Sequence, residues 1–543
     1  MLIYLIISLV LAVLPLMVRT ERMTNIVASL FFTVQVAGIA LVIALGKVDG
    51  VMLSIFRADS MAILFHALMT VVLGFSLLHS SSYLKAENVS TRSYKAYYTL
   101  LMLLAVAITC VYYSDNIAMT WVFLEATTIC SAGIIYHREF QQSLEATWKY
   151  VFVCSTGIAM AYLGILLLST VATHGALDYA SLKEVIAEGN PLYLKVAFLL
   201  MVVGYSCKME IFPLYTVGVD ANYAAPAPAS AFISTALVNA GFVSIMRIYT
   251  LYANTGDVFE WARHVLILIG VLSLAVGAMF LRRANNYKRF LSYSTVENMG
   301  IVAIGLGIGG VALWAAVFHV VCHTFVKSSM FYHVGIMRHV YDSYSINRIG
   351  NYININRVGA IGFIVGTLVL LAFPPSPLFI SEVMIFTEIV SVEKWWLLVL
   401  MLVLMCVVLY AIWSRSLRLG YHSNQDELHL SAVNRRLSYI ASLPLVIAIV
   451  FGLWQPAVLS EAIDNIIEVN TECDTPVVEV EDAVVVEDAL VEETATEVAD
   501  AEAADEVVAD EVVAEESVDA ATVEEQTEVE CEIETVSTDE NLE

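Results

Sequence analysis

Residues 193–216 read YLKVAFLLMVVGYSCKMEIFPLYT, an apolar run that carries a lysine and a proline in its interior. The run is long enough to cross the hydrocarbon core of a bilayer, which takes about 20 residues of α-helix. Lys208 lies thirteen residues after Lys195, which places it about 20 Å into the membrane at about 1.5 Å per residue. Pro213 removes one helical hydrogen bond and interrupts the helix. The stretch therefore predicts a broken membrane-spanning helix with a buried charge beside the break.

Apolar runs of similar length recur through the first 460 residues, and each ends in a charge or in a cluster of Gly, Pro or Asn. This alternation is typical of membrane-spanning helices joined by short loops. The sequence therefore predicts an all-α polytopic membrane protein of about fourteen transmembrane helices. The expected helices are residues 2–17, 25–46, 59–80, 96–113, 116–136, 148–170, 193–216, 226–252, 260–281, 293–311, 312–337, 357–391 (long, broken or in two pieces), 395–414 and 437–457.

Acidic residues are concentrated at the C-terminal end. The chain has 53 Asp and Glu against 27 Lys and Arg, a net charge of −26, and residues 461–543 hold 31 of those acids with no Lys or Arg. Subtraction leaves residues 1–460 with 22 acids and 27 bases, a net of +5. A segment whose charges all have one sign resists compaction. The sequence therefore predicts a disordered acidic tail at 461–543, and the alternative is a weak amphipathic helix that orders on a partner.

The loops differ in basic charge from one side of the membrane to the other. Loops after odd-numbered helices contain seventeen Lys and Arg, and loops after even-numbered helices contain six. Lys and Arg mark the cytoplasmic side, so with fourteen helices both termini are predicted on the outer, periplasmic side of the cell (inner) membrane. Residues 1–17 are expected to form the first span and not a cleavable signal, because no basic segment precedes the apolar run.

Four basic residues remain inside the expected spans: Lys149, Lys208, Arg247 and Lys327. A charge at mid-bilayer costs about 2.5–3.5 kcal/mol even on insertion scales, so such residues need partners, water or a function. Glu125, in WVFLEATTIC, also lies at mid-span. If Glu125 faces Lys208 on a neighbouring helix, the proton affinity of each depends on the other. That coupling is what a proton switch needs.

The eleventh expected helix contains AVFHVVCHTFVKSSMFYHVG, residues 316–335. His319, His323 and Lys327 follow one another at intervals of four residues, so they share one face of the helix, about 6 Å apart along its axis. Titratable groups in such a column form a proton relay when water fills the gaps. Two His at this spacing could instead bind a metal, but no Glu or Cys stands in the usual zinc context. We therefore expect a relay and no metal.

A second helix break is expected in AFPPSPLFISEVMIF, residues 372–386, where three prolines precede Glu382. Interrupted helices in corresponding positions of two halves indicate an inverted repeat with central sites. The predicted organisation is N-terminal helices 1–3 in residues 1–95, two five-helix repeats and a last transmembrane helix. The repeats occupy residues 96–252 and 260–414, and the last helix residues 437–457.

Three further positions have simpler interpretations. Glu297 is either a lateral member of the relay or a partner of Arg247. Lys149 lies four residues after Glu145, at the spacing of a helical ion pair. Asp59 is expected to cap the third helix. The eight cysteines are scattered singly without a CxxC, so neither an iron–sulfur cluster nor any other cofactor is expected in the chain.

Five segments resemble the antiporter-type proton-pumping subunits of complex I, Mrp cation/proton antiporters and group 4 membrane-bound hydrogenases, with hydrogenase-4 component F and the formate hydrogenlyase membrane subunits the most similar branch. The segments are WVFLEATTICSA, SLEATWKYVFVCSTGIAMAYLG, DANYAAPAPASAFISTALVNAGFVSIMRIY, FLSYSTVENMGIVAIGLGIGG and HVVCHTFVKSSMFYHVG. The resemblance covers about residues 50–390. It implies fourteen helices, two inverted five-helix repeats, broken helices seven and twelve, and redox-driven proton translocation.

The resemblance also implies roles for single residues. Glu125 and Lys208 are similar to the family's Glu–Lys pair, Lys327 to its central lysine, and Glu382 to the ionisable residue of helix twelve. Three positions depart from the family. Asn239 stands where complex I subunits have a helix-eight lysine, the loop VDANYAAP keeps Asp220 but loses a His and a Glu, and Glu297-Asn298 replaces a Ser-His or Glu-His pair.

The sequence thus predicts a proton-translocating membrane subunit of a redox-driven, hydrogenase-4 or complex I-like assembly. The chain itself would hold no redox centre, and it would work with other membrane subunits and, through them, with a peripheral redox arm. The alternative is the Na⁺/H⁺ antiporter module of an Mrp-type complex. The predicted proton pathway consists of Glu125, Lys208, Lys327, Glu382, His319, His323, Glu297, Lys149, Arg247 and Asp220.

Overall fold

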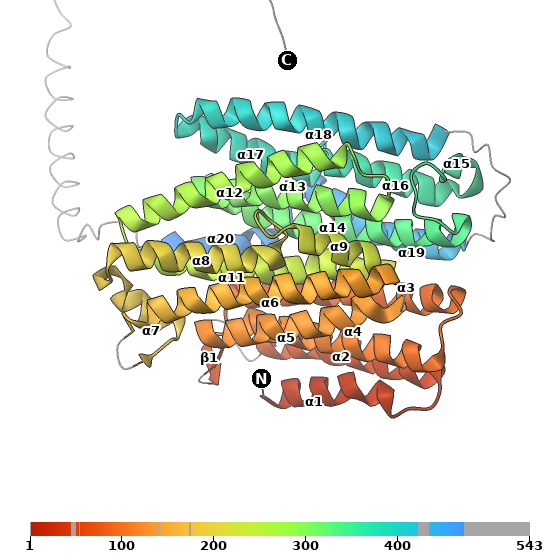
Figure 1. Ribbon diagram of the computed structural model, residues 1–543, viewed down its shortest axis with the longest axis horizontal. Coiled ribbons are helices and arrows are strands. Elements are labelled where there is room, and N and C mark those ends of the chain that lie inside the picture. Colours follow the sequence, from red (N-terminus) through yellow and green to blue (C-terminus); the bar gives the residue numbers. More distant parts are fainter. Residues whose placement is uncertain are drawn as a thin grey trace, which may run out of the picture. The chain divides into compact units, whose positions relative to one another are not determined.

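The structure, a computed structural model, describes residues 2–44, 50–53, 55–138, 141–172, 175–421 and 434–471. Most of these residues lie in helices, and the long helices run side by side (Figure 1). Eleven helices within the described ranges are long and apolar enough to cross a membrane, and Leu2–Leu16 and Arg357–Leu370 are shorter apolar helices. The predicted all-α, polytopic membrane fold is confirmed.

Each of the fourteen predicted segments contains at least one helix. In chain order these helices are α1 (Leu2–Val13), α2 (Glu21–Ala44), α3 (Ser60–Ala86), α4 (Thr91–Tyr113), α5 (Ile117–Ile135), α6 (Gln141–Ser169), α8 (Pro191–Met209) with α9 (Thr216–Ala224), α10 (Ala227–Phe232) with α11 (Val238–Tyr252), α12 (Asp257–Leu281), α13 (Tyr287–Ile308), α14 (Val311–Tyr341), α16 (Arg357–Leu370) with α17 (Pro377–Ser391), α18 (Trp395–Tyr421) and α19 (Arg435–Leu453). Shorter elements join them: strands β1 (Gly50–Leu53) and β2 (Phe56–Ala58), which pair antiparallel, and helices α7 (Tyr179–Val185), α15 (Tyr352–Ile355) and α20 (Ala457–Thr471).

Side-chain caps fix where several helices begin. Asp59 accepts a hydrogen bond from the Ala62 backbone N–H at the start of α3, as predicted. Asn116 caps α5 and Asn286 caps α13 in the same way. A short polar side chain at this position satisfies backbone N–H groups that have no partner within the helix. The caps therefore set the ends of the helices that carry the site.

Both predicted helix breaks are present. α8 ends at Met209, Glu210 has a left-handed backbone with φ of 59°, and α9 begins only at Thr216. α16 ends at Leu370, Ala372 has φ of 49°, and α17 begins at Pro377. Each gap also holds a proline, which cannot donate a helical hydrogen bond. The five-helix repeats that these breaks suggested remain a prediction.

The chain packs closely beside the first break. A π-helical turn, Ile233–Leu237, joins α10 to α11. A Cβ atom on Gly241 of α11 would lie 2.4 Å from the Met209 backbone nitrogen, closer than any real contact. The absence of a side chain at Gly241 lets the end of α8 lie directly on α11, in the interior of the bundle.

The predicted start of the acidic tail at residue 461 is wrong. α20 continues to Thr471, and it packs against α3 and α14 through the buried side chains of Ile463 and Ile466. The Trp314 indole N–H donates to Asp464 at 2.8 Å. Composition could not show this helix, because its three acids merge with those that follow. Residues 472–543, and with them the predicted disorder, lie outside the described residues.

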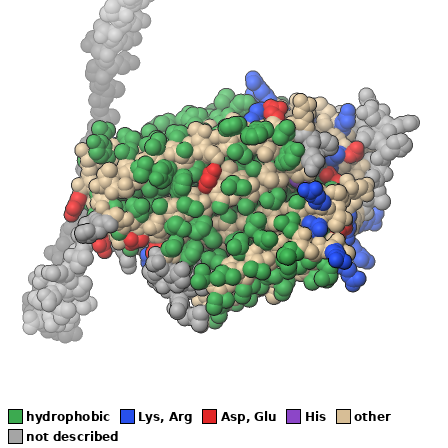
Figure 2. All heavy atoms as spheres, turned by 60° about the horizontal axis from the view of Figure 1, so that its bottom comes forward, with side chains coloured by type: hydrophobic (Ala, Val, Ile, Leu, Met, Phe, Trp, Pro, Cys, Tyr) green, Lys and Arg blue, Asp and Glu red, His purple; other side chains and the backbone are tan. Residues whose placement is uncertain are grey.

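Apolar side chains cover much of the molecular surface between the helix ends. Figure 2 shows one face dominated by hydrophobic side chains, with Lys and Arg gathered at one end of it. Large exposed side chains such as Ile129, Phe152 and Trp396 are more than half accessible. In water such a surface would promote aggregation, whereas lipid solvates it. The multi-pass assignment is thereby supported, and the side on which the termini lie remains a prediction.

Candidate functional site

A row of ionisable side chains lies inside the bundle. Each of its buried members is at most 4% exposed: Lys208, Glu210, Glu297, His319, His323, Lys327 and Glu382. An isolated charge in such a place is expensive, so ionised members need partners or water. Their contacts show how the row is held together.

The predicted pair of Glu125 and Lys208 is joined by a hydroxyl group. The Lys208 ammonium donates to Thr128 Oγ1 at 2.8 Å and lies 3.4 Å from the Tyr150 hydroxyl. Thr128 Oγ1 donates in turn to Glu125 Oε2 at 3.2 Å, and Ser155 donates to Glu125 Oε1 at 2.8 Å. A hydroxyl accepts and donates at once, so Thr128 can pass a proton between acid and base.

Lys327 of α14 occupies the centre of the row. Its ammonium donates to the Leu291 carbonyl at 2.6 Å and to Ser294 Oγ, both on α13. The carboxyl groups of Glu297 and Glu210 both attract it electrostatically. Lys327 is thus within electrostatic reach of two acids, Glu297 on α13 and Glu210 at the end of α8.

Glu210 is a site residue that the sequence analysis missed. Its Oε1 accepts a hydrogen bond from Asn222 Nδ2 at 2.9 Å, and its buried Oε2 has no hydrogen-bond partner within the described part of the chain. It stands two residues after Lys208, and the left-handed backbone that ends α8 turns its side chain toward α9. A glutamate shortly before the proline that breaks a helix was the available signal.

The second half of the row runs through α13, α14 and α17. Asn298 donates to Glu297 Oε2 at 2.5 Å, and its carbonyl oxygen lies 3.1 Å from His319 Nε2. His319 Nδ1 lies 2.9 Å from Ser381 Oγ, next to Glu382. Glu297 and Glu382 line one cavity of about 140 Å³. Hydrogen bonds thus connect Glu297 of α13 with Ser381 of α17, and the shared cavity brings Glu297 and Glu382 together.

His323 completes the predicted column on α14. Its ring lies 6.4 Å from that of His319, centre to centre. Neither ring nitrogen of His323 has a hydrogen-bond partner among the described residues. His319, His323 and Lys327 therefore share a helix face as expected, but direct hydrogen bonds do not join them. Any relay between them needs water.

A first vestibule, of about 610 Å³, opens at one end of the bundle, where α6 begins. Arg289 donates to Asp220 at 3.0 Å beside it. Lys149 and Glu145 form an exposed ion pair at 2.5 Å on its rim. The Glu145–Lys149 interpretation is therefore confirmed as a contact, and both predicted polar residues, Lys149 and Asp220, face this vestibule.

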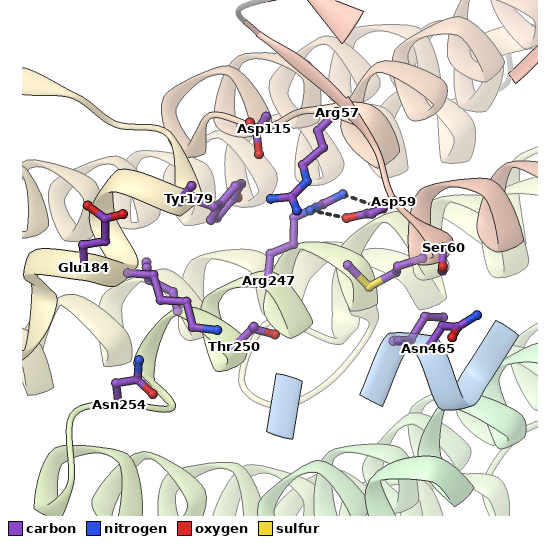
Figure 3. A pocket seen from close by; sticks show the side chains of 15 residues that line it. Arg57, Asp59, Ser60, Asp115, Tyr179, Glu184, Arg247, Thr250, Asn254 and Asn465 are labelled. Atoms are coloured by element: carbon purple, nitrogen blue, oxygen red, sulfur yellow. Dashed lines mark hydrogen bonds and ion pairs between the residues drawn. The ribbon is translucent and has the colours of Figure 1, made fainter. Parts of the chain in front are cut away.

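A second vestibule, of about 440 Å³, lies at the other end, where α5 begins (Figure 3). Arg247 pairs with Asp59 at 2.9 Å and donates to the Tyr112 carbonyl at 2.7 Å. The alternative that Glu297 is the partner of Arg247 is thus wrong, because the cap of α3 takes that place. Asp115 lies between the spans α4 and α5, and burial raises its pKa above the usual value, while Arg57 and Arg247 oppose the rise.

Buried acids and bases inside a bundle with two polar vestibules define the chain as a polytopic helical membrane protein with ionisable groups in its interior. The transmembrane family described as NADH:quinone oxidoreductase/Mrp antiporter matches residues 114–408, and the chain belongs to this family. The resemblance stated from the sequence is confirmed.

Individual relatives have low sequence identity to this chain, but the matches extend over more than half of it. The chain is 28% identical over 347 residues to a hydrogenase-4 component F homolog of Methylacidiphilum infernorum, a match that covers 62% of this chain and 72% of the relative. It is 27% identical over 369 residues to a Na⁺/H⁺ antiporter subunit of Alkalihalophilus pseudofirmus, covering 64% of this chain but only 44% of that protein. One chain of an archaeal membrane-bound sulfane sulfur reductase has a similar fold, with a TM-score of 0.74 at 21% identity, covering 87% of this chain and 96% of that one.

Proposed function

We propose that this chain is the proton-translocating membrane subunit of a redox-driven complex. The observation that carries the proposal is the row of ionisable side chains from the partly buried Glu125, through the buried Lys208 and Lys327, to the buried Glu382. A hydrophobic scaffold has no use for these groups, because each is unfavourable to bury. Ionisable residues inside a membrane are typical of proton relays.

The proton would move by coupled changes of charge along the row. The Thr128 hydroxyl accepts from the Lys208 ammonium and donates to Glu125, so a proton can pass between the two groups through it. Lys327 is within electrostatic reach of Glu210 and Glu297, so its charge is coupled to theirs.

Other subunits would supply the driving reaction. The relatives named above belong to a hydrogenase and to an antiporter, and the structural neighbour to a respiratory complex. We infer that this chain sits in the cell (inner) membrane beside other membrane subunits, with a peripheral redox arm reached through them. In this arrangement the chain conducts protons and handles no electrons.

The second candidate is a Na⁺/H⁺ antiporter module, which the likeness to the antiporter relative favours. Both candidates use the same row, so the driving force distinguishes them. A redox-driven subunit moves protons when NADH or hydrogen is oxidised. An antiporter module moves them when Na⁺ is added across a preformed pH gradient.

The test uses inverted membrane vesicles that contain the whole complex and a pH-sensitive dye. We expect NADH or hydrogen to acidify the vesicles, and Lys208→Ala to abolish this signal while the complex still co-purifies. Lys85→Ala is the matched control, because Lys85 is exposed at the end of α3. Near-normal acidification in assembled Lys208→Ala complexes contradicts the proposal. A signal that depends on Na⁺ alone selects the antiporter.

A further inference from the structure

We propose that Glu210 is the proton carrier that joins the two halves of the buried row. The inference rests on the proposed function and adds to it a residue that connects Lys208 with Lys327. It starts from the helix break, where two residues of opposite charge point to different parts of the bundle.

The break separates the directions of the two side chains. Lys208, in the last turn of α8, reaches Thr128 of α5 and Tyr150 of α6. Glu210, one residue beyond the helix end, reaches Asn222 of α9 and interacts electrostatically with Lys327 of α14. In a continuous helix the two residues would be about 200° apart on one cylinder. The left-handed backbone at Glu210 ends α8 instead. Lys208 therefore contacts α5 and α6, whereas Glu210 contacts α9.

α11 lies beside the break, but the buried Asn239 side chain of α11 cannot carry a proton between Lys208 and Lys327. Asn239 Nδ2 donates to Thr324 Oγ1 at 2.9 Å, and the Thr324 hydroxyl donates to the Val320 backbone carbonyl at 2.8 Å. A carboxamide neither binds nor releases a proton at physiological pH. Glu210, two residues after Lys208 and within electrostatic reach of Lys327, is a titratable group beside the break, whereas Asn239 is not.

The surroundings hold the Glu210 carboxyl group in place. A Cβ atom on Gly218 would lie 2.4 Å from the carboxyl carbon of Glu210, so α9 fits the carboxyl group only because residue 218 has no side chain. A left-handed backbone is unfavourable for glutamate and persists where the surrounding structure determines it. The geometry therefore fixes one carboxyl oxygen on Asn222 and leaves Oε2 without a hydrogen-bond partner among the described residues.

The proton transfers balance without any co-reactant. Glu210 as a carboxylic acid gives its Oε2 proton to the neutral amine of Lys327, through a bridging water, and leaves a carboxylate and an ammonium. Since both charges arise together, their attraction offsets part of the cost of forming them in the membrane. The ammonium of Lys208 then returns a proton to Glu210, and Lys208 is recharged from Glu125 through Thr128.

The test substitutes Glu210→Gln in the whole complex, since glutamine keeps an acceptor for Asn222 and fills the same space. We expect acidification of inverted vesicles to fall at least tenfold with unchanged assembly. Glu210→Asp should recover part of the loss, because it restores a carboxyl group. Glu188→Gln, on an exposed glutamate of a loop turn, is the matched control and should behave as the wild type.

Lys327→Ala separates the inference from the function on which it rests. If Lys327→Ala abolishes acidification while Glu210→Gln leaves it near normal, the role of Glu210 is refuted and the proposed function stands. If neither substitution has an effect, the proposed function fails as well.

Two further measurements exclude a purely structural role. Infrared spectra of the resting complex should contain the C=O stretch of a protonated carboxylic acid that disappears in Glu210→Gln, and persistence of the full band overturns the proposal. Gly218→Ala should also slow acidification, by displacing the carboxyl group. Combined with Glu210→Gln it should add no further loss, whereas additive losses show that Gly218 acts independently of Glu210.

Discussion

Thr128→Val would test how strongly the hydroxyl between Lys208 and Glu125 matters. Valine has nearly the same shape as threonine, but it can neither accept from the ammonium nor donate to the carboxylate. The substitution removes a charged hydrogen bond of 2.8 Å and a second of 3.2 Å, and it leaves Lys208 with Tyr150 at 3.4 Å.

The expected size of the effect follows from the first of these bonds. A hydrogen bond to a charged group is worth about 1.5–3 kcal/mol, and we take about 2 kcal/mol because Tyr150 compensates partly. If proton transfer needs this link, a loss of about 2 kcal/mol slows it about 30-fold. The 3.2 Å bond to Glu125 adds a smaller loss.

The assay is vesicle acidification per mole of assembled complex. Thr128→Ser restores the hydroxyl and should recover most of the activity. Thr156→Val is the matched control, because the Thr156 hydroxyl is exposed and its hydrogen-bond partner among the described residues is the Phe152 carbonyl in its own helix. Wild-type rates in Thr128→Val, in complexes where Lys208→Ala is inactive, would refute the hydroxyl link.

Three other predictions concern separate parts of the chain. The double variant His319→Ala plus His323→Ala should leave the metal content of the purified complex unchanged, since a relay of imidazoles holds no metal; elemental analysis that finds a stoichiometric metal lost in this variant contradicts the relay. Hydrogen bonds from Ser181 hold the pKa of Asp178 below its usual value. The ionised Asp178 therefore stabilises α7 fully above the usual pKa of an aspartate, and this stabilisation is lost as the pH falls through the lowered pKa of the folded protein. Asp178→Ala should lower the free energy of unfolding by about 1 kcal/mol at neutral pH and by less in acid, as measured by thermal unfolding. A loss that does not change with pH refutes the role of Asp178 as a cap. Protease added outside the inner membrane should remove the acidic residues after Thr471, and protection until that membrane is broken means that the predicted orientation is wrong.

Much of the fold followed from the sequence because apolar length and proline position are local properties. A run of about 20 apolar residues determines a span, and a proline removes a helical hydrogen bond at its own position, although Pro444 lies inside α19 without ending it. The breaks after Met209 and Leu370 and the cap at Asp59 were therefore predictable. The column His319, His323, Lys327 was predictable for the same reason, since helical periodicity alone sets it.

The connections between helices were not predictable, because they depend on how each helix is rotated in the bundle. Nothing in the sequence shows that Thr128 stands between Glu125 and Lys208. Arg247 lies 188 positions from Asp59 in the chain, and helix packing brings them together. The contacts of Glu210 were not predictable either, because the left-handed backbone after α8 places its side chain against α9 while Lys208 contacts α5 and α6.

The wall of the second vestibule bears on any experiment that removes the acidic segment. Asn465 and Ile466 of α20 line this vestibule beside Asp59 and Arg247. A chain cut at residue 460 loses part of that wall, together with the Asp464–Trp314 contact. An altered proton flux in that variant could therefore come from the damaged second vestibule. A chain cut after Thr471 keeps the wall and loses only residues outside the helix. Comparing the two truncations separates the contribution of the acidic residues 472–543 from that of α20, to which they are attached.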